Sequence, residues 1–320
     1  MRALVGLLTV GAVLASAAWT AAVPAPPVAD GSLIATKVAP GGFPKALVDP
    51  LGKMATLPSP PQRIVSIALS GDELLLELVP PERLVGLTYL IDDPATTPSA
   101  PLAPAAAARV TEENPERLLS LQPSFVVTAD YTRAEAIVLM EAAGIPVLDL
   151  GTLMNLDDVL RAIATLGNAV GEPARAEALE ASLRARIQAV QDRPRPAHTP
   201  RVLLWESGYS YGRGTMQDDL IRRAGGVDAA SEAGQHGPVA LTEEAAVVFD
   251  PDVVVVPTED LAPRGRDVSL LGTAPVWRVV RAVQQGRVYG IPRAWMGSVS
   301  HHAVKALEAL ADMMRDERAP

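Results

Sequence analysis

The sequence predicts an α/β protein of two Rossmann-like lobes with mainly parallel sheets, connected by a single long α-helix, with a ligand cleft between the lobes. Three observations support this fold class. Short apolar runs alternate with helical patterns from Arg63 onward, the alternation restarts after Arg201, and one long helical stretch separates the halves. Alternating strands and helices form parallel sheets that helices cover on both faces.

The first lobe follows a segment rich in proline, glycine and alanine, residues 23–62, where we expect at most a small hairpin around LVDPLGKMATL. The runs RIVSIAL, LVGLTY, FVVTA and PVLDL predict strands, and DELLLEL, PERLLSL and AEAIVLMEAA predict helices. SGDE, Ser70 to Glu73, fits a capping box at the first of these helices. We assign residues 23–45 to a flexible leader and 46–171 to the N-terminal lobe.

Two helical stretches follow. The first carries an apolar stripe from Leu156 to Leu166 and stops near Gly171, and Pro173 opens a second that runs to about Gln191. A helix of about 20 residues spans about 30 Å. Its narrow apolar stripe and charged sides suit a helix that runs between two domains. We assign residues 172–193 to this inter-lobe helix.

The second lobe, residues 194–320, repeats the organisation of the first. RVLLW, MQDDLIRRA, TEEAAVVF, DVVVV, VWRVVRAV and RVYGI continue the alternation, and HHAVKALEALADMM forms a final helix. PERLLSLQPSFVV and TEEAAVVFDPDVVVV superpose without gaps as helix, proline turn and buried strand. The two lobes are therefore expected to be alike.

Composition and the N-terminus narrow the function. A formal charge of −9 and a pI near 5.0 argue against nucleic-acid binding. Met1-Arg2, an apolar run and then small residues predict a signal peptide over residues 1–22, because the run is too short to cross a bilayer. With no cysteine there is no disulfide, thiolate site or lipid anchor. We expect an exported protein that is free in a periplasm.

One motif suggests catalysis. GYSYG is a G-x-S-x-G match with Ser210 at the nucleophile position, and Asp250 or Asp252 and then His301 or His302 follow in hydrolase order. GRGT, however, separates the serine from the next helix, and no HGGG-like segment precedes it. A glycine-rich pocket loop is the favoured interpretation, and a secreted serine hydrolase is the alternative function.

Metal binding by side chains is poorly supported. His198 lies in the proline linker, His236 lies in a loop, and the adjacent His301 and His302 point to different faces of a helix. We therefore expect no metal site and no cofactor of the protein's own.

Aromatic and cationic residues gather where predicted strands end. In open α/β sheets the ligand crevice lies beyond the carboxyl ends of the strands, so these side chains are expected to face a cleft. The candidates for ligand binding are Tyr89, Tyr131, Arg133, Tyr209, Tyr211, Arg213, Arg293 and Trp295.

These residues carry a resemblance that covers nearly everything from residue 46 to 315. The hairpin and first strand, the paired PERLLSLQPSFVV and TEEAAVVFDPDVVVV, the loop GRGTMQDDLIRRAGGVDAAS and the end WRVVRAVQQGRVYGIP all resemble the periplasmic substrate-binding proteins of ABC importers for ferric siderophores, haem and cobalamin. The resemblance implies capture of a metal chelate without catalysis, limited hinge motion, and delivery by a monomer to the permease dimer in the inner membrane.

In this family one glutamate on each lobe docks into arginine pockets of the permease. By motif these are Glu116 in NPERLLSLQP and Glu244 in LTEEAAVVFDP. With Asn114 and Thr242 as N-caps, both glutamates fall at the second helical position, N2. A carboxylate that only serves its helix would suit N1 or N3 equally, so the shared position favours docking.

The resemblance leaves the substrate open. Cobalamin binders of this group place tryptophans around the cleft, but the matching positions here are Val110, Ala129 and Pro238, which do not support cobalamin. Haem binders need an axial Tyr or His, for which Tyr89, Tyr131, Tyr209 and His236 are candidates. The arginines with their tyrosines and Trp295 suit an anionic ferric chelate. The expected order is ferric siderophore, then a cobalamin-like corrinoid, then haem.

Overall fold

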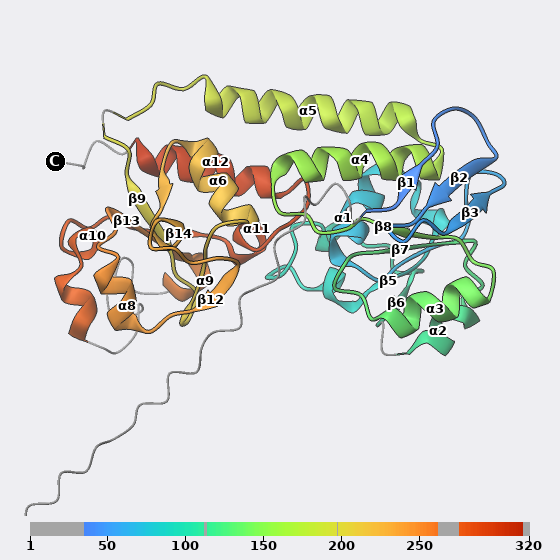
Figure 1. Ribbon diagram of the computed structural model, residues 1–320, viewed down its shortest axis with the longest axis horizontal. Helices are drawn as coiled ribbons and strands as arrows, with labels where there is room; N and C mark the ends of the chain where they lie inside the picture. The colour runs from blue at the N-terminus through green and yellow to red at the C-terminus, as the bar shows by residue number, and fades with distance from the viewer. Residues whose placement is uncertain (1–34, 112–113, 197, 262–274, 316–320) are drawn as a thin grey trace, which may run out of the picture.

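The computed structural model describes residues 35–111, 114–196, 198–261 and 275–315. Two α/β lobes lie side by side beneath one long helix (Figure 1). The expected signal peptide, residues 1–22, lies outside the described residues. Within those residues, no helix combines the length and the apolar character needed to cross a bilayer.

The N-terminal lobe is built on a five-stranded sheet in which every neighbouring pair is parallel. The strand order is β6-β5-β4-β7-β8. The strands are β4 (Ile64–Ser66), β5 (Leu84–Thr88), β6 (Ala108–Val110), β7 (Phe125–Thr128) and β8 (Val147–Asp149). The central strands are buried on both faces, as expected of the apolar runs that form them.

Helices cover both faces of this sheet. Phe125 and Val127 share a core cluster with α1 (Leu69–Leu78) and α4 (Leu156–Val170), whereas Val126 packs with α2 (Pro115–Ser120) and α3 (Ala134–Ala142). Because successive strand residues point to opposite faces, one apolar run serves two cores. Short 3₁₀ turns connect the elements: η2 (Pro81–Arg83), η3 (Tyr89–Asp92) and η4 (Ala100–Leu102).

The expected hairpin is present and belongs to a small antiparallel sheet. It comprises β1 (Lys37–Val38), β2 (Lys45–Val48) and β3 (Met54–Leu57) in that order. Residues 37–45, which we assigned to the leader, therefore contribute to the lobe. The Lys45 ammonium, 4% exposed as a residue, donates to Asn168 Oδ1 at 2.7 Å and thereby ties β2 to α4.

The C-terminal lobe repeats the plan with a four-stranded parallel sheet in the order β11-β9-β13-β14. These strands are β9 (Arg201–Leu204), β11 (Val227–Asp228), β13 (Val253–Pro257) and β14 (Val288–Ile291). A two-stranded antiparallel ribbon pairs β10 (Tyr209–Tyr211) with β12 (Pro238–Ala240). The helical elements are α6 (Met216–Ala224), α7 (Ala229–Glu232), α8 (Glu243–Val248), α9 (Thr258–Leu261), η6 (Pro275–Val279), α10 (Arg281–Gln284), α11 (Arg293–Met296) and α12 (Ala303–Met314).

The long helix α5 (Pro173–Gln191) packs against α4 of the first lobe and α12 of the second (Figure 1). Proline at its first position suits a helix start. Its buried residues are Ala176, Leu183, Ile187 and Val190, and most of the others face solvent. Arg186 on α5 forms a bidentate pair with Glu308 on α12 at 2.8 and 2.7 Å.

Candidate functional site

The carboxyl ends of the parallel strands carry the candidate ligand residues. In the N-terminal lobe, Tyr89 directly follows β5, and Tyr131 lies three residues after the end of β7. Tyr89 is 59% exposed and Tyr131 is 57% exposed. Large aromatic rings are usually buried, so two exposed tyrosines at one edge of one sheet offer a surface for a ligand.

The surroundings of Tyr131 shift the pKa of its hydroxyl. Burial raises this pKa to about 12, and the nearby Asp72 and Asp130 carboxylates add to the shift. Asp72 is itself buried and accepts from the Thr88 amide at 3.0 Å. Its pKa is raised by burial, although hydrogen bonds from Thr88 and Ser66 oppose the shift. Tyr131 therefore stays a protonated phenol near neutral pH.

In the C-terminal lobe, three adjacent strand ends bring together a cluster of charges. Glu206 follows β9, Asp260 follows β13, and Arg293 follows β14. The Arg293 guanidinium pairs with Glu206 and lies 3.2 Å from Asp260 Oδ1. Tyr211 Oη donates to the other oxygen of Glu206 at 2.8 Å. Two candidates from the sequence, Tyr211 and Arg293, thus meet through a carboxylate that sequence analysis missed.

The β10–β12 ribbon and the loops next to it carry three further candidates of this lobe. Tyr209 is 56% exposed, and Arg213 and His236, both exposed, are bridge partners across the loop. The Arg213 amide donates to the Gln235 carbonyl at 2.9 Å. A Cβ on Gly212 would lie 2.4 Å from that carbonyl oxygen, so only glycine permits this close approach.

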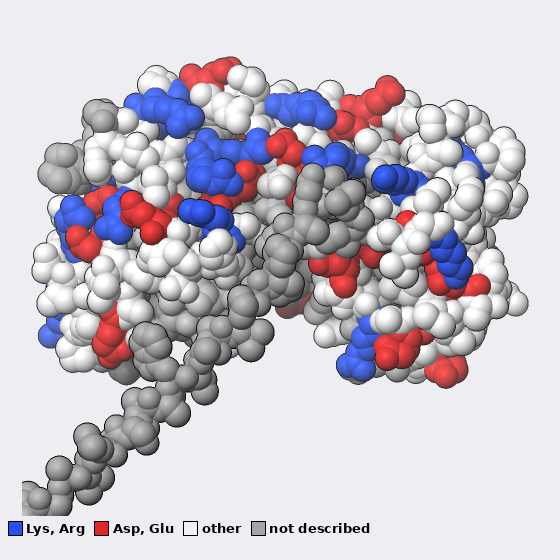
Figure 2. All heavy atoms as spheres, viewed as in Figure 1, with Lys and Arg blue, Asp and Glu red and all other residues white. Residues whose placement is uncertain are grey.

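Trp295 is partly buried and packs against the main core cluster, with the Lys305 ammonium 5.9 Å from its ring centroid. Arg133 precedes α3 and is exposed on the N-terminal lobe. The candidates thus divide between the two lobes, and we refer to the strand ends that carry them as the two walls. Figure 2 shows the surface hollowed between the two lobes, on the side away from α5.

The docking candidates occupy the helix positions that the sequence predicts. Asn114 Oδ1 accepts from the Arg117 amide at 3.0 Å, and Thr242 Oγ1 accepts from the Ala245 amide at 3.2 Å. Glu116 and Glu244 are therefore both at N2, and both are exposed. Helices α2 and α8 lie on different lobes but on the same side of the molecule, away from α5 (Figure 1).

Ser210 is not placed as a hydrolase nucleophile. It lies within β10 rather than on a turn into a helix, its exposed fraction is 0%, and its Oγ lacks a hydrogen-bond partner among the described residues. The next helix, α6, begins only after Thr215. A nucleophile elbow needs a serine exposed at a strand-to-helix turn, so the motif match is accidental.

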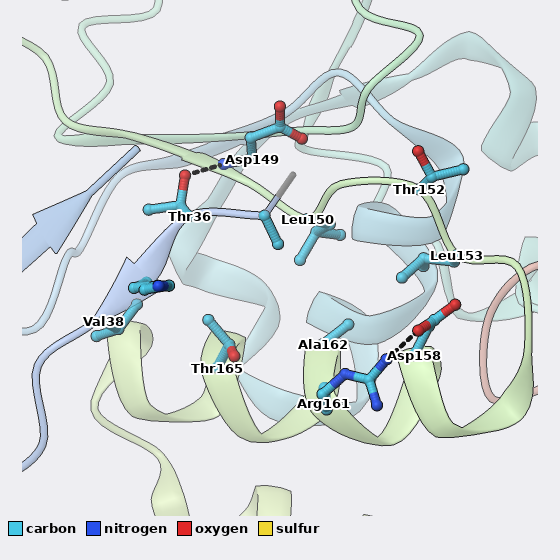
Figure 3. A pocket seen from close by; sticks show the side chains of 12 residues that line it. Thr36, Val38, Asp149, Leu150, Thr152, Leu153, Asp158, Arg161, Ala162 and Thr165 are labelled. Atoms are coloured by element: carbon cyan, nitrogen blue, oxygen red, sulfur yellow. Dashed lines mark hydrogen bonds and ion pairs between the residues drawn. The ribbon is translucent and has the colours of Figure 1, made fainter. Parts of the chain in front are cut away.

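A separate pocket of about 290 Å³ lies beside α4 in the N-terminal lobe (Figure 3). Leu150, Leu153 and Ala162 form its apolar part, and Asp158 pairs with Arg161 at its rim. These two charges compensate each other, so the pocket offers them to no ligand. No group of three or more histidine, aspartate or glutamate side chains within the described ranges is arranged to hold a metal ion.

Comparison with known proteins gives consistent results. A family description of periplasmic binding proteins matches residues 64–294. The "Cobalamin-binding protein" of Halobacterium salinarum is 26% identical over 279 residues, which cover 85% of this chain and 73% of the relative. The "Uncharacterized ABC transporter substrate-binding lipoprotein YvrC" of Bacillus subtilis is 25% identical over 282 residues, covering 84% of this chain and 85% of the relative.

The fold has solved counterparts. The apo structure of the periplasmic heme-binding protein RhuT from Roseiflexus sp. RS-1 superposes with a TM-score of 0.67 at 27% identity, covering 81% of this chain and 99% of that one. The family match spans most of the chain, so the chain belongs to the periplasmic binding protein family. Relatives of this chain include proteins that are named for binding cobalamin and heme.

Proposed function

We propose that this protein captures a metal chelate between its lobes and delivers it to an ABC permease, which grips Glu116 on one lobe and Glu244 on the other. The observation that carries the proposal is the matched pair of glutamates. Both are exposed at N2 of a short helix, and α2 and α8 lie on the same side of the molecule (Figure 1). A permease dimer that presents two equivalent basic pockets is the partner that such a pair fits.

Helix stabilisation alone accounts poorly for this arrangement. A carboxylate in the first turn contributes about 0.3–1 kcal/mol to its helix, and N1 or N3 serves nearly as well. The N-cap side chains of Asn114 and Thr242 already accept from these first turns. A geometric requirement explains why the same position is used in both lobes.

For the ligand, we propose a metal tetrapyrrole, with a ferric siderophore as the second candidate. Relatives at 26% and 27% identity are a cobalamin-binding and a heme-binding protein. The exposed rings of Tyr89, Tyr131 and Tyr209 suit the flat faces of a macrocycle. The sequence suggested Arg293 as a partner for an anionic siderophore. In the structure Arg293 instead forms ion pairs with Glu206 and Asp260.

The N-terminal segment supports export. An apolar run follows Arg2, as in a signal peptide. We propose that the protein works in the periplasm as a monomer and that it carries out no catalysis.

Charge reversal tests the docking role. We expect Glu116→Arg and Glu244→Arg each to reduce chelate uptake by cells about tenfold or more, and the double variant to abolish it, because arginine would face the basic pockets. Ligand affinity of the purified variants should change less than twofold. Glu177→Arg is the matched control, because Glu177 is exposed on α5, on the opposite side of the molecule, and should leave uptake intact. A loss of affinity in the first two variants would instead place the glutamates in the fold or in the cleft.

A further inference from the structure

The C-terminal wall of the cleft carries an excess of negative charge. Glu206 follows β9, Glu259 and Asp260 follow β13, and the Arg293 guanidinium is paired with Glu206 and Asp260. Glu259 is exposed and accepts from the backbone amide of Arg293, at the start of α11, at 3.1 and 3.3 Å. These three carboxylates and one guanidinium together carry two negative charges in excess.

Arg293 cannot easily turn toward an anionic ligand. One terminal nitrogen of the guanidinium pairs with Glu206 and the other lies 3.2 Å from Asp260 Oδ1. Pairing on both sides fixes the orientation of a planar guanidinium and occupies its two terminal nitrogens. A carboxylate of an incoming ligand would have to displace one of these partners and would also meet the other.

The other charged residues that adjoin the candidate tyrosines do not reverse this excess. Arg133 and Arg213 are exposed, and Asp130 is exposed beside Tyr131. Four carboxylates therefore stand against three guanidinium groups, and the tyrosines are uncharged. Figure 2 shows acidic side chains bordering the hollow on the side of the N-terminal lobe.

We infer that the C-terminal wall selects its ligand by charge, favouring neutral or cationic metal chelates over anionic ones, with Glu206 and Asp260 as the specificity-determining residues. The inference rests on the proposed function and narrows it. A ligand whose rim carries amide N–H groups donates to these carboxylates, whereas one whose rim carries carboxylates is repelled by them. Partial burial of Glu206 and Asp260, whose side chains are 20% and 29% exposed, weakens screening by water and salt.

Ligand pairs in which a carboxylate replaces an amide or an amine test the inference. Cyanocobalamin is compared with its monocarboxylic acid, haemin with its bis-amide, and ferrioxamine B with its N-succinyl derivative. For whichever chelate binds, we expect the amide or amine member to bind at least about tenfold more tightly than the carboxylate member at low salt. Tenfold is the size expected for one like charge about 6 Å away at an effective dielectric constant of about 40, and two of the pairs differ by two charges. The ratio should shrink as salt is raised.

Variants locate the source of the preference. Glu206→Gln and Asp260→Asn keep side-chain shape, and we expect each to bring the ratio within a pair close to one by tightening the binding of the carboxylate member. Glu232→Gln is the matched control. Glu232 also pairs with an arginine, Arg201 at 2.6 Å, but at the start of β9, the opposite edge of the same sheet. Circular dichroism and melting temperature show whether each variant is folded.

The outcomes separate the inference from the proposed function. If no member of any pair binds, the proposed function fails and the inference fails with it. If a chelate binds but the carboxylate member is preferred, or if Glu206→Gln and Asp260→Asn leave the ratio at its original value while remaining folded, the inference alone is overturned.

Discussion

At the scale of single residues, Ser210 shows how a motif can match without its chemistry. The Oγ is fully buried within β10, where no substrate carbonyl can reach it. We expect no covalent adduct with a fluorophosphonate probe. Ser210→Ala should leave ligand binding unchanged and alter the free energy of unfolding by less than about 1 kcal/mol, because the hydroxyl it removes has no partner among the described residues. An adduct that disappears in Ser210→Ala would restore the hydrolase alternative.

Residues whose roles depend on local sequence are the ones that sequence analysis places correctly. Asn114 and Thr242 are caps because their side chains accept from amides three residues ahead, and this fixes Glu116 and Glu244 at N2. Glu206 and Asp260 escape such analysis, and so does their pairing with the predicted Arg293, because the three residues meet only through the strand order β9-β13-β14. Their common position two or three residues after a buried strand is the signal that could have found Glu206 and Asp260.

At the scale of elements, the capping box at Ser70 is wrong. Helix α1 begins at Leu69 with Ala68 as its N-cap residue, and no side chain caps it. Ser70 and Glu73 lie inside the helix and are buried. Glu73 accepts from Thr97 rather than reaching back to the helix start. The pattern was local, but the burial that decides the role of Glu73 comes from chain segments far away in sequence.

The antiparallel pair α4 and α5 depends on one glycine. A Cβ on Gly167 would lie 2.2 Å from the Ala176 Cβ, so the two helices meet where neither has a larger side chain. We expect Gly167→Ala to lower the free energy of unfolding by about 1–3 kcal/mol, despite the better helix propensity of alanine. Denaturant unfolding measures the loss.

Ala176→Gly in the same chain supplies the control for this prediction. It removes the opposing methyl group, so the double variant should recover part of the stability that Gly167→Ala loses. Strictly additive effects of the two substitutions would contradict close packing at this point.

At the scale of the whole molecule, contacts besides α5 hold the lobes together. Arg223 pairs with Asp157 at 2.7 Å, the Leu156 amide donates to Asp219 at 3.2 Å, and Ser99 Oγ lies 2.7 Å from His302 Nε2. Each contact joins the two lobes. They support the expectation of limited hinge motion, which remains a prediction.

The buried histidines in this junction make stability sensitive to acid. Burial lowers the pKa of His301 to about 4, with Lys305 and Arg186 adding to the shift, and burial together with His301 lowers that of His302 to about 3. The unfolded chain therefore binds protons below about pH 6.5 that the folded protein does not. Stability falls as pH is lowered from 6.5 toward 4, by about 2 kcal/mol per histidine at pH 5.

A double variant isolates this contribution. Asp228, whose pKa burial raises to about 6, acts in the opposite sense because its charged form destabilises the fold as pH rises from about 4 to 6. It is present in both proteins and cancels in the comparison. We expect His301→Gln with His302→Gln to lose about 4 kcal/mol less between pH 7 and pH 5 than the unmodified chain, measured by urea unfolding. Equal losses would mean that the histidines are protonated in the fold.

Much of the architecture, including both parallel sheets and the long helix α5, can be predicted because local hydrophobic periodicity determines it. The contacts between side chains of different strands depend on residues far apart in the sequence. Sequence analysis could therefore predict that strand ends form the ligand walls, but not which side chains pair there. The identity of the ligand depends on those pairs.

The central claim is that this protein binds a metal chelate between its lobes. Titration of the purified chain with a panel of cobalamins, haemin and ferric siderophores, followed by tryptophan fluorescence and calorimetry, tests it most directly. We predict saturable binding of one chelate per protein molecule with a Kd of about 1 μM or tighter for at least one member of the panel. The absence of binding across the whole panel at micromolar concentrations would contradict the account.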